Sequence, residues 1–292
     1  MRPWLDRTGH LSPLKAIVFA ALFVPALWVA GAFALGALGG RPLHAALLQM
    51  GVWTVRLLFL TLIVTPLRQS LQWPRLISVR RMLGVATFAY AATHLTLYSA
   101  DQSFNLAKVA SEIISRIYLT IGFVALLGLA TLAATSTDAM VRRLGARAWR
   151  RLHQLVYLIG VLAVTHFFLQ SKADVGQPII MAGLFAWLMF YRVLGKLFGK
   201  GGRVPLWAVT LLAPVASLLT ALGEALYFWL KVGVSPLRVL DTDLSLIAGI
   251  RPAQVVLAIT LAFVAICLLR LLAKPDAGWR QRWRQRLNPR PA

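Results

Sequence analysis

The stretch RRMLGVATFAYAATHLTLY, residues 80–98, decides the fold of this chain. Two arginines open it, and a largely apolar run follows in which His94 lies about five residues before the end. A run of this length that carries its charge at one end is typical of a helix that crosses a lipid bilayer. The stretch therefore predicts a transmembrane helix with one ionisable side chain inside it.

Similar apolar runs recur along the whole chain. Of the 292 residues, 59% are hydrophobic and only 14% are charged, whereas a soluble domain usually carries about 25% charged residues. The mean hydropathy is +0.72. Eight spans are expected, at about 13–36, 51–67, 82–99, 117–135, 152–170, 178–195, 204–230 and 253–273. The sequence thus predicts an all-α, polytopic transmembrane bundle of about eight helices in a lipid bilayer.

The basic residues predict the orientation of the chain. The net charge is +22, and 23 of the 31 Lys and Arg fall on one side of the expected spans. Because short cytoplasmic loops carry the excess of Lys and Arg, both termini are expected in the cytoplasm. This arrangement between apolar spans accounts for the charge without nucleic-acid binding. The one cysteine, Cys267, excludes a disulfide within the chain and a cysteine-ligated metal centre.

Two of the five histidines are expected at matching depths in the membrane. His94 lies in the third span and His166 in the fifth, and both spans run toward the same face. Two neutral imidazoles on facing helices can hold one haem by axial ligation. Hydrogen bonding between helices and a proton or ion pathway are the alternatives. The remaining tail and loop histidines, His10 and His44, are expected to be solvated.

A second redox centre is conceivable near the opposite face. His153 lies 13 residues before His166, which is about 20 Å along a helix axis. The same spacing rotates the helix by roughly 220° beyond whole turns, so an ideal helix does not present both on one face. On the third span, the corresponding position is held by Arg80, which could pair with haem propionates, ligate iron weakly or anchor the helix. The sequence therefore supports one bis-histidine haem better than two.

Two other charged residues lie within the expected spans. Arg56, in the second span, has no obvious partner and could neutralise a haem propionate or anchor its helix. Glu224 is the only acidic residue inside a span, and the sequence shows no opposite charge for it. A non-redox transporter or scaffold, the alternative function, would need such ionisable groups to converge near the midplane.

Several motifs together resemble one known family. The resembling segments are TLIVTPLR (61–68), the 80–98 stretch, TSTDAMVRRLGARAWRRLHQLVYL (135–158) and THFFLQSK (165–172). They are similar to the MsrQ (YedZ) haem-binding membrane subunits of the ferric-reductase-like transmembrane superfamily. The resemblance covers residues 10–197. It implies a six-helix haem-binding core at 1–200, which leaves 201–292 as a two-helix extension with a basic cytoplasmic tail.

The resemblance also implies function and site residues. His94, His153 and His166 fall on the three functional histidines of the family, whereas Arg80 is a candidate cofactor-binding residue only through its register with His94. The family is associated with haem b and FMN in the bacterial inner membrane. It implies an electron-transfer subunit that takes electrons from the quinone pool or a cytoplasmic flavin reductase. The recipient is MsrP, a periplasmic molybdopterin enzyme that reduces methionine sulfoxide in oxidised proteins.

Overall fold

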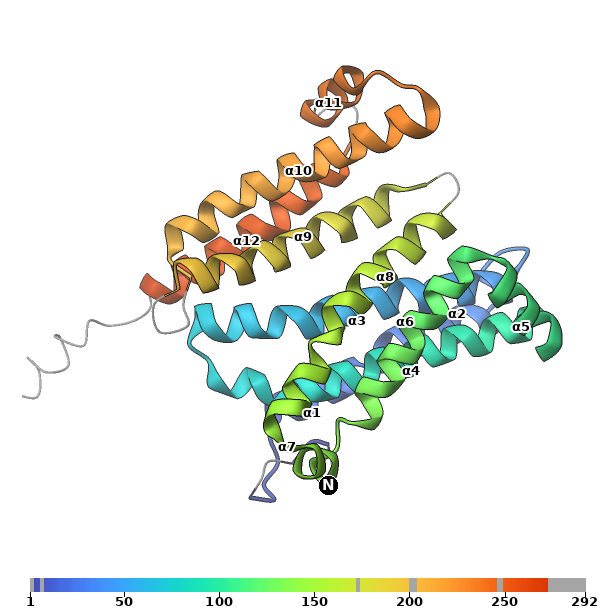
Figure 1. Ribbon diagram of the computed structural model, residues 1–292, viewed down its shortest axis with the longest axis horizontal. Coiled ribbons are helices and arrows are strands. Elements are labelled where there is room, and N and C mark those ends of the chain that lie inside the picture. Colours follow the sequence, from blue (N-terminus) through green and yellow to red (C-terminus); the bar gives the residue numbers. More distant parts are fainter. Residues whose placement is uncertain (1–2, 6–7, 172–173, 200–203, 246–248, 273–292) are drawn as a thin grey trace, which may run out of the picture. The chain divides into compact units, whose positions relative to one another are not determined.

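The computed structural model describes residues 3–5, 8–171, 174–199, 204–245 and 249–272 (Figure 1). The predicted basic tail, 273–292, lies outside the described residues, as do several of the basic loop residues used for the orientation. Those loop residues are Arg2, Arg7, Lys172, Lys200 and Arg203.

The described residues are helical almost throughout, which confirms the all-α prediction. The α-helices are α1 (Pro13–Ala21), α2 (Val24–Ala34), α3 (Pro42–Leu71), α4 (Ile77–Asp101), α5 (Leu106–Ser115), α6 (Ile117–Ala134), α7 (Asp138–His153), α8 (Leu155–Gln170), α9 (Gly176–Leu197), α10 (Leu206–Val232), α11 (Pro236–Leu244) and α12 (Pro252–Leu272). One 3-10 turn, η1 (Pro74–Leu76), precedes α4. Each of the eight expected spans falls on one or two of these helices.

Seven helical segments in the described part of the chain are long and apolar enough to cross a membrane. The protein is therefore a multi-pass membrane protein. The expected span that is not among these seven is the one at 82–99. It lies in α4, which has 25 residues, enough to cross the roughly 30 Å hydrocarbon layer. Its hydropathy is lower because it carries several polar side chains, among them Thr87, Thr93 and His94.

The first span is broken, where one continuous helix was expected. Pro25 lies in the first turn of α2, and proline cannot donate an intrahelical hydrogen bond and clashes with the preceding turn. The Tyr90 hydroxyl of α4 occupies the break. It donates to the carbonyl of Leu22 at 2.6 Å and accepts from the N–H of Ala26 at 3.1 Å. The break is thus stabilised by a side chain far away in sequence, and α1 with α2 still counts as one membrane segment.

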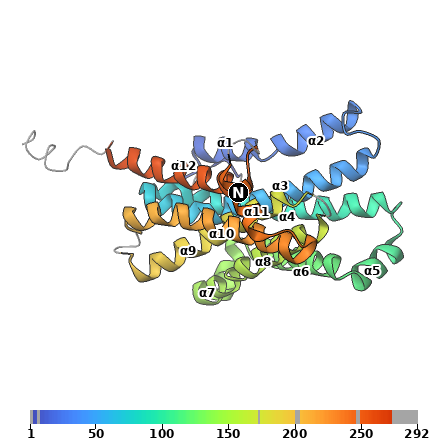
Figure 2. The ribbon, with the colours of Figure 1, turned by 90° about the horizontal axis from the view of Figure 1, so that it is seen from above.

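The chain divides into two compact units. The first contains residues 1–68 and 73–189, and the second contains residues 69–72 and 190–292. In the first unit α6 packs against α8 and α4 (Figures 1 and 2). Its core includes Met50, Leu57 and Tyr90, with a second cluster around Val79 and Leu83.

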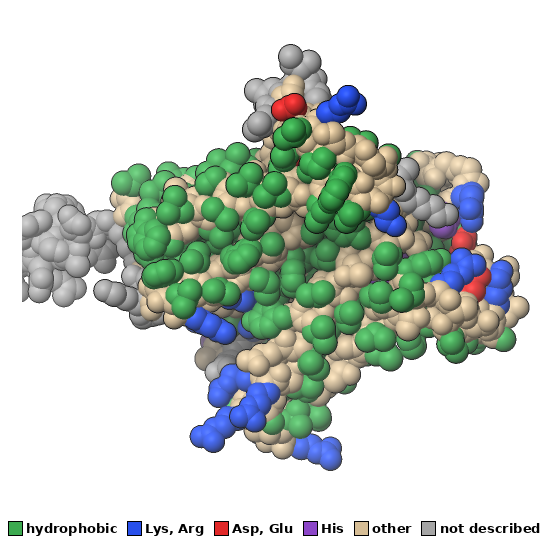
Figure 3. Space-filling model, turned by 45° about the horizontal axis from the view of Figure 1, so that its top comes forward, with side chains coloured by type: hydrophobic (Ala, Val, Ile, Leu, Met, Phe, Trp, Pro, Cys, Tyr) green, Lys and Arg blue, Asp and Glu red, His purple; other side chains and the backbone are tan. Residues whose placement is uncertain are grey.

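The second unit is built on a hairpin of α10 and α12, with the short α11 packed against its turn end (Figure 1). Ser217 of α10 donates to the carbonyl of Ala253 in α12 at 2.9 Å. Figure 3 shows apolar side chains spread over much of the visible surface. On α10, the exposed apolar side chains lie along one face of the helix. They include Leu211, Leu218, Leu222 and Leu226. A stripe of this kind is suited to contact lipid rather than water.

Candidate functional site

The structure brings His94 and His166 together in the first unit. His94 lies in the last third of α4, and His166 lies near the end of α8. Their ring centroids are 6.4 Å apart and the ring planes are nearly perpendicular, at 84°. The two side chains that were expected at matching depths therefore lie next to each other, with their rings edge to face.

Each of these rings is held through one nitrogen by a backbone carbonyl of a neighbouring helix. Nδ1 of His94 lies 2.8 Å from the carbonyl oxygen of Leu47 in α3, and Nδ1 of His166 lies 2.7 Å from that of Tyr118 in α6. A carbonyl can only accept, so each Nδ1 carries the proton and donates it. The neutral tautomer leaves a lone pair on each Nε2, the form in which imidazole binds a metal ion.

Each ring also lies against a glycine one turn beyond that carbonyl. A β-carbon at Gly51 of α3 would lie 2.9 Å from the ring of His94, and one at Gly122 of α6 would lie 2.7 Å from the ring of His166. Real side chains essentially never approach so closely. The two sites therefore share one arrangement, in which a helix supplies a carbonyl and, four residues later, a glycine that makes room for the imidazole.

The two histidines were predicted from the sequence, whereas the residues that support their rings were not: Leu47, Gly51, Tyr118 and Gly122. The side chains of Leu47 and Tyr118 do not identify these positions in the sequence, because it is the backbone carbonyl that binds the histidine. A glycine inside an apolar span, as at Gly51 and Gly122, was the available hint, since glycine in a helix often marks close packing.

The pair fits one haem. Two imidazoles that bind one metal ion from opposite sides at about 2 Å have ring centroids on the order of 6 Å apart, close to the 6.4 Å observed. The glycines that make room for the two rings, Gly51 and Gly122, and the carbonyls that fix the tautomers would hold each imidazole in a set orientation. Among the described residues, no group of three or more His, Cys, Asp and Glu could hold a metal ion.

A network of polar side chains supports Tyr118. The Tyr98 hydroxyl of α4 donates to the Glu112 carboxylate of α5, and Arg116 pairs with Glu112 at 3.4 Å. Arg116 also donates to the Tyr118 hydroxyl at 3.1 Å. These contacts join α4, α5 and the start of α6 beside the carbonyl that orients His166.

His153 has different contacts from those of His94 and His166. Its Nδ1 lies 3.1 Å from the carbonyl oxygen of Trp149, and its Nε2 lies 3.4 Å from the Ser136 hydroxyl. The ring stacks on Trp149, with centroids 3.8 Å apart. Arg80 and Arg81 are near enough to act on it electrostatically. His153 ends α7 and contacts Trp149 and Ser136, whereas His166 belongs to α8 and contacts Tyr118, so the two histidines use different neighbours.

Arg56 donates to Gln177 at 3.4 Å and lies 4.8 Å from the centre of the Trp53 ring, both of them neutral groups. The expectation that Glu224 has no opposite charge was wrong, because Arg251 donates to its carboxylate at 2.5 Å. The partner escaped notice because it lies 27 residues away, in the turn before the last helix.

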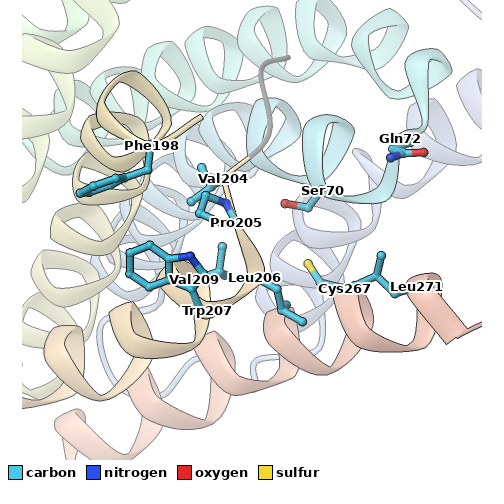
Figure 4. A pocket seen from close by; sticks show the side chains of 10 residues that line it. All are labelled: Ser70, Gln72, Phe198, Val204, Pro205, Leu206, Trp207, Val209, Cys267 and Leu271. Carbon is cyan, nitrogen blue, oxygen red and sulfur yellow. The ribbon is translucent and has the colours of Figure 1, made fainter. Parts of the chain in front are cut away.

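The second unit contains a pocket of about 560 Å³ (Figure 4). Apolar and aromatic side chains dominate its lining, and Figure 4 shows Phe198 and Trp207 on one side with Cys267 and Leu271 of α12 on the other. The Ser70 hydroxyl also lines it and shares a 2.8 Å hydrogen bond with the Tyr191 hydroxyl. None of the predicted site residues lines this pocket.

Comparisons with known proteins agree with the transmembrane helices. Residues 50–164 match the family model described as ferric reductase like transmembrane component. A Rhodospirillum rubrum protein named protein-methionine-sulfoxide reductase heme-binding subunit MsrQ is 38% identical over 68% of this chain and 95% of its own length. A protein of that name from Caulobacter vibrioides is 40% identical over 61% of this chain and 85% of its own length. Another from Xanthomonas campestris pv. campestris is 42% identical over 64% of this chain and 88% of its own length. No solved structure matches. The chain therefore belongs to the MsrQ family of ferric-reductase-like membrane proteins.

Proposed function

We propose that this chain is the haem b-binding subunit of a protein-methionine-sulfoxide reductase system, with His94 and His166 as the axial ligands. The observation that carries the proposal is the pair of imidazoles whose Nδ1 protons are fixed by carbonyls at 2.8 and 2.7 Å. That arrangement leaves a basic nitrogen on each of two rings whose centroids lie 6.4 Å apart. The printed names of the relatives, which describe a heme-binding subunit, support the same cofactor.

The residues of the chain set the conditions for electron transfer. The carbonyls of Leu47 and Tyr118 hold the tautomer and the ring orientation, and Gly51 and Gly122 admit the rings between helices. A bound haem would supply a one-electron carrier, whose potential depends on ligands, hydrogen bonds and burial. The chain thus serves as a conductor in an oxidoreductase complex and need not act on the sulfoxide itself.

The count of cofactors favours one haem. The ring of His153 is stacked on Trp149, with centroids 3.8 Å apart, and the Ser136 hydroxyl lies 3.4 Å from its Nε2, so protein side chains occupy the space around this ring. We propose that His153, with the nearby Arg80, acts where electrons enter rather than as a ligand of a second haem. FMN at this end is a proposal that rests on the family resemblance.

The orientation and partners complete the proposal. We propose that both termini lie in the cytoplasm of a bacterial inner membrane and that the histidine pair lies near the periplasmic face; the bias of Lys and Arg to one side of the spans supports this orientation. Electrons would come from quinol or from a cytoplasmic flavin reductase, and would leave to a periplasmic molybdopterin reductase of the MsrP type. The two-helix region at 201–292 would be an addition to the electron-transferring core.

The decisive experiment is a spectrum of the purified full-length protein produced with ample haem. We expect a sharp reduced-minus-oxidised α band in the wild type, and its loss in His94→Ala and in His166→Ala. His10→Ala, in the N-terminal tail, is the matched control and should keep the band. A colourless wild-type protein would defeat the proposal in favour of a non-redox transporter or scaffold, and full haem content in His94→Ala would disprove the ligand pair.

A further inference from the structure

The second unit contains three charged side chains that meet where α10, α11 and the start of α12 come together. Glu224 of α10 is 2% exposed and Asp243 of α11 is 5% exposed. Arg251, in the turn before α12, donates from Nη2 to Glu224 at 2.5 Å and from Nε to Asp243 at 3.1 Å. One guanidinium group therefore serves two buried carboxyl groups from two different helices.

The cluster is held in place by further hydrogen bonds. Gln254, in the first turn of α12, donates from its amide to the backbone carbonyl of Asp243 at 2.9 Å. Its amide oxygen accepts from the backbone N–H of Arg251 at 3.3 Å. The cluster thus joins α11 to the end of the hairpin, where Figure 1 shows α11.

The charges of the cluster do not balance. With both carboxyl groups ionised, two negative charges face one positive charge. The other charged residues on these elements, Asp241 and Arg238 on α11 and Lys231 at the end of α10, are exposed to the surroundings. A buried net charge is strongly unfavourable because it has lost its hydration without a full partner.

The hydrogen bonds do not balance either. Oε2 of Glu224 and Oδ2 of Asp243 are both buried, and neither has a hydrogen-bond partner. Buried carboxylate oxygens without a donor are rare because each forfeits its interaction with water. Both carboxyl groups bind adjacent nitrogens, Nη2 and Nε, of the same guanidinium, so they are neighbours in the cluster. One added proton corrects both deficits: the cluster becomes neutral, and one carboxyl group donates to the free oxygen of the other.

We propose that Glu224 and Asp243 form a binding site for one exchangeable proton, and that this proton holds α11 on the α10–α12 hairpin. Loss of the proton leaves two adjacent carboxylates that repel each other, and the contact through Asp243 weakens. The docked state binds one proton more than the undocked state, so raising the pH favours release of α11 and lowering it favours docking. The site is independent of the haem ligands and would make this end of the protein responsive to acidity.

Infrared spectroscopy of the full-length protein tests the bound proton. We expect the carbonyl stretch of a protonated carboxyl group at neutral pH, shifted in heavy water and lost at high pH. Glu224→Gln and Asp243→Asn should each abolish it, because the remaining carboxylate then pairs with Arg251 alone. Asp241→Asn, on the exposed side of α11, is the matched control. Absence of the band in the wild type, or its survival in both variants, would overturn the proposal.

A label on α11 tests the consequence. Leu237 is 72% exposed, so a spin label at Leu237→Cys in a Cys267→Ser background should report the mobility of α11. Mobility should rise with pH in the otherwise wild-type chain and stay constant when Glu224→Gln is added. An equal pH response in both proteins would contradict the proposal. A response to sodium at constant pH would show a metal cation in place of the proton, which would also refute it. The haem spectrum should be unchanged throughout, which separates this outcome from the proposed electron transfer.

Discussion

The two histidine environments of the first unit use the same side chain in opposite ways. His94 and His166 each have one ring nitrogen bound to a carbonyl and one left over, and each ring lies against a glycine. His153 has its Nδ1 at the carbonyl of Trp149, the Ser136 hydroxyl 3.4 Å from its Nε2 and an indole ring on its face. Under the proposed function, the two environments differ in what the neighbouring helices place around each ring, rather than in the depth of a histidine in a span.

The largest effect on haem content is expected when the glycines against the His94 and His166 rings, Gly51 and Gly122, are replaced by alanine. Gly122→Ala would put a methyl group 2.7 Å from the His166 ring, and Gly51→Ala one 2.9 Å from His94. Overpacking of this kind costs about 1–3 kcal/mol, and here it displaces a ligand, so haem per polypeptide should fall severalfold. Gly84→Ala is the control, because its added carbon meets only a methyl of Thr61 at 3.8 Å. Equal haem content in all three variants would show that these two glycines do not position the ligands.

A smaller and different effect is expected at the other environment. His153→Ala removes the stack on Trp149, a contact worth about 1 kcal/mol, while the histidine pair is untouched. Haem content should therefore stay at the wild-type level and thermal stability should decline slightly. Electron transfer from the donor should slow if His153 lies on the entry route. Loss of half of the haem would instead reveal a second centre ligated by His153.

The smallest effect is expected when one partner of His153 is removed. Ser136→Ala leaves Nε2 of His153 without its 3.4 Å contact, which should cost less than about 1 kcal/mol. The haem count should remain one, because Trp149 still covers the ring. A count that rises to two would mean that a single hydroxyl separates the two environments, and would favour two redox centres.

Much of the fold was open to prediction because membrane helices are specified locally. Apolar length alone sets each span, and the alternation of basic loops sets the expected orientation. Pro25 was the available signal for the break in the first span, although Pro66 in α3 and Pro214 in α10 lie inside continuous helices, so proline alone does not decide where a helix breaks. The prediction failed there because a long apolar run was taken as one helix.

The candidate site was only half open to prediction. The depths of His94 and His166 follow from counting residues along two helices, a one-dimensional property. The supporting carbonyls of Leu47 and Tyr118 belong to helices far away in sequence, and no side chain identifies them. The same limit concealed the partner of Glu224, because 27 residues and a turn separate it from Arg251.

The sequence by itself determined that this is a multi-pass helical membrane protein of the MsrQ family, with two histidines at one depth. These properties depend on composition, spacing and motif, which need no knowledge of neighbours. Only the tertiary structure decided which histidines keep a free nitrogen and which buried carboxyl groups share one guanidinium. Those outcomes depend on hydrogen-bond partners from other helices, and packing in three dimensions chooses the partners.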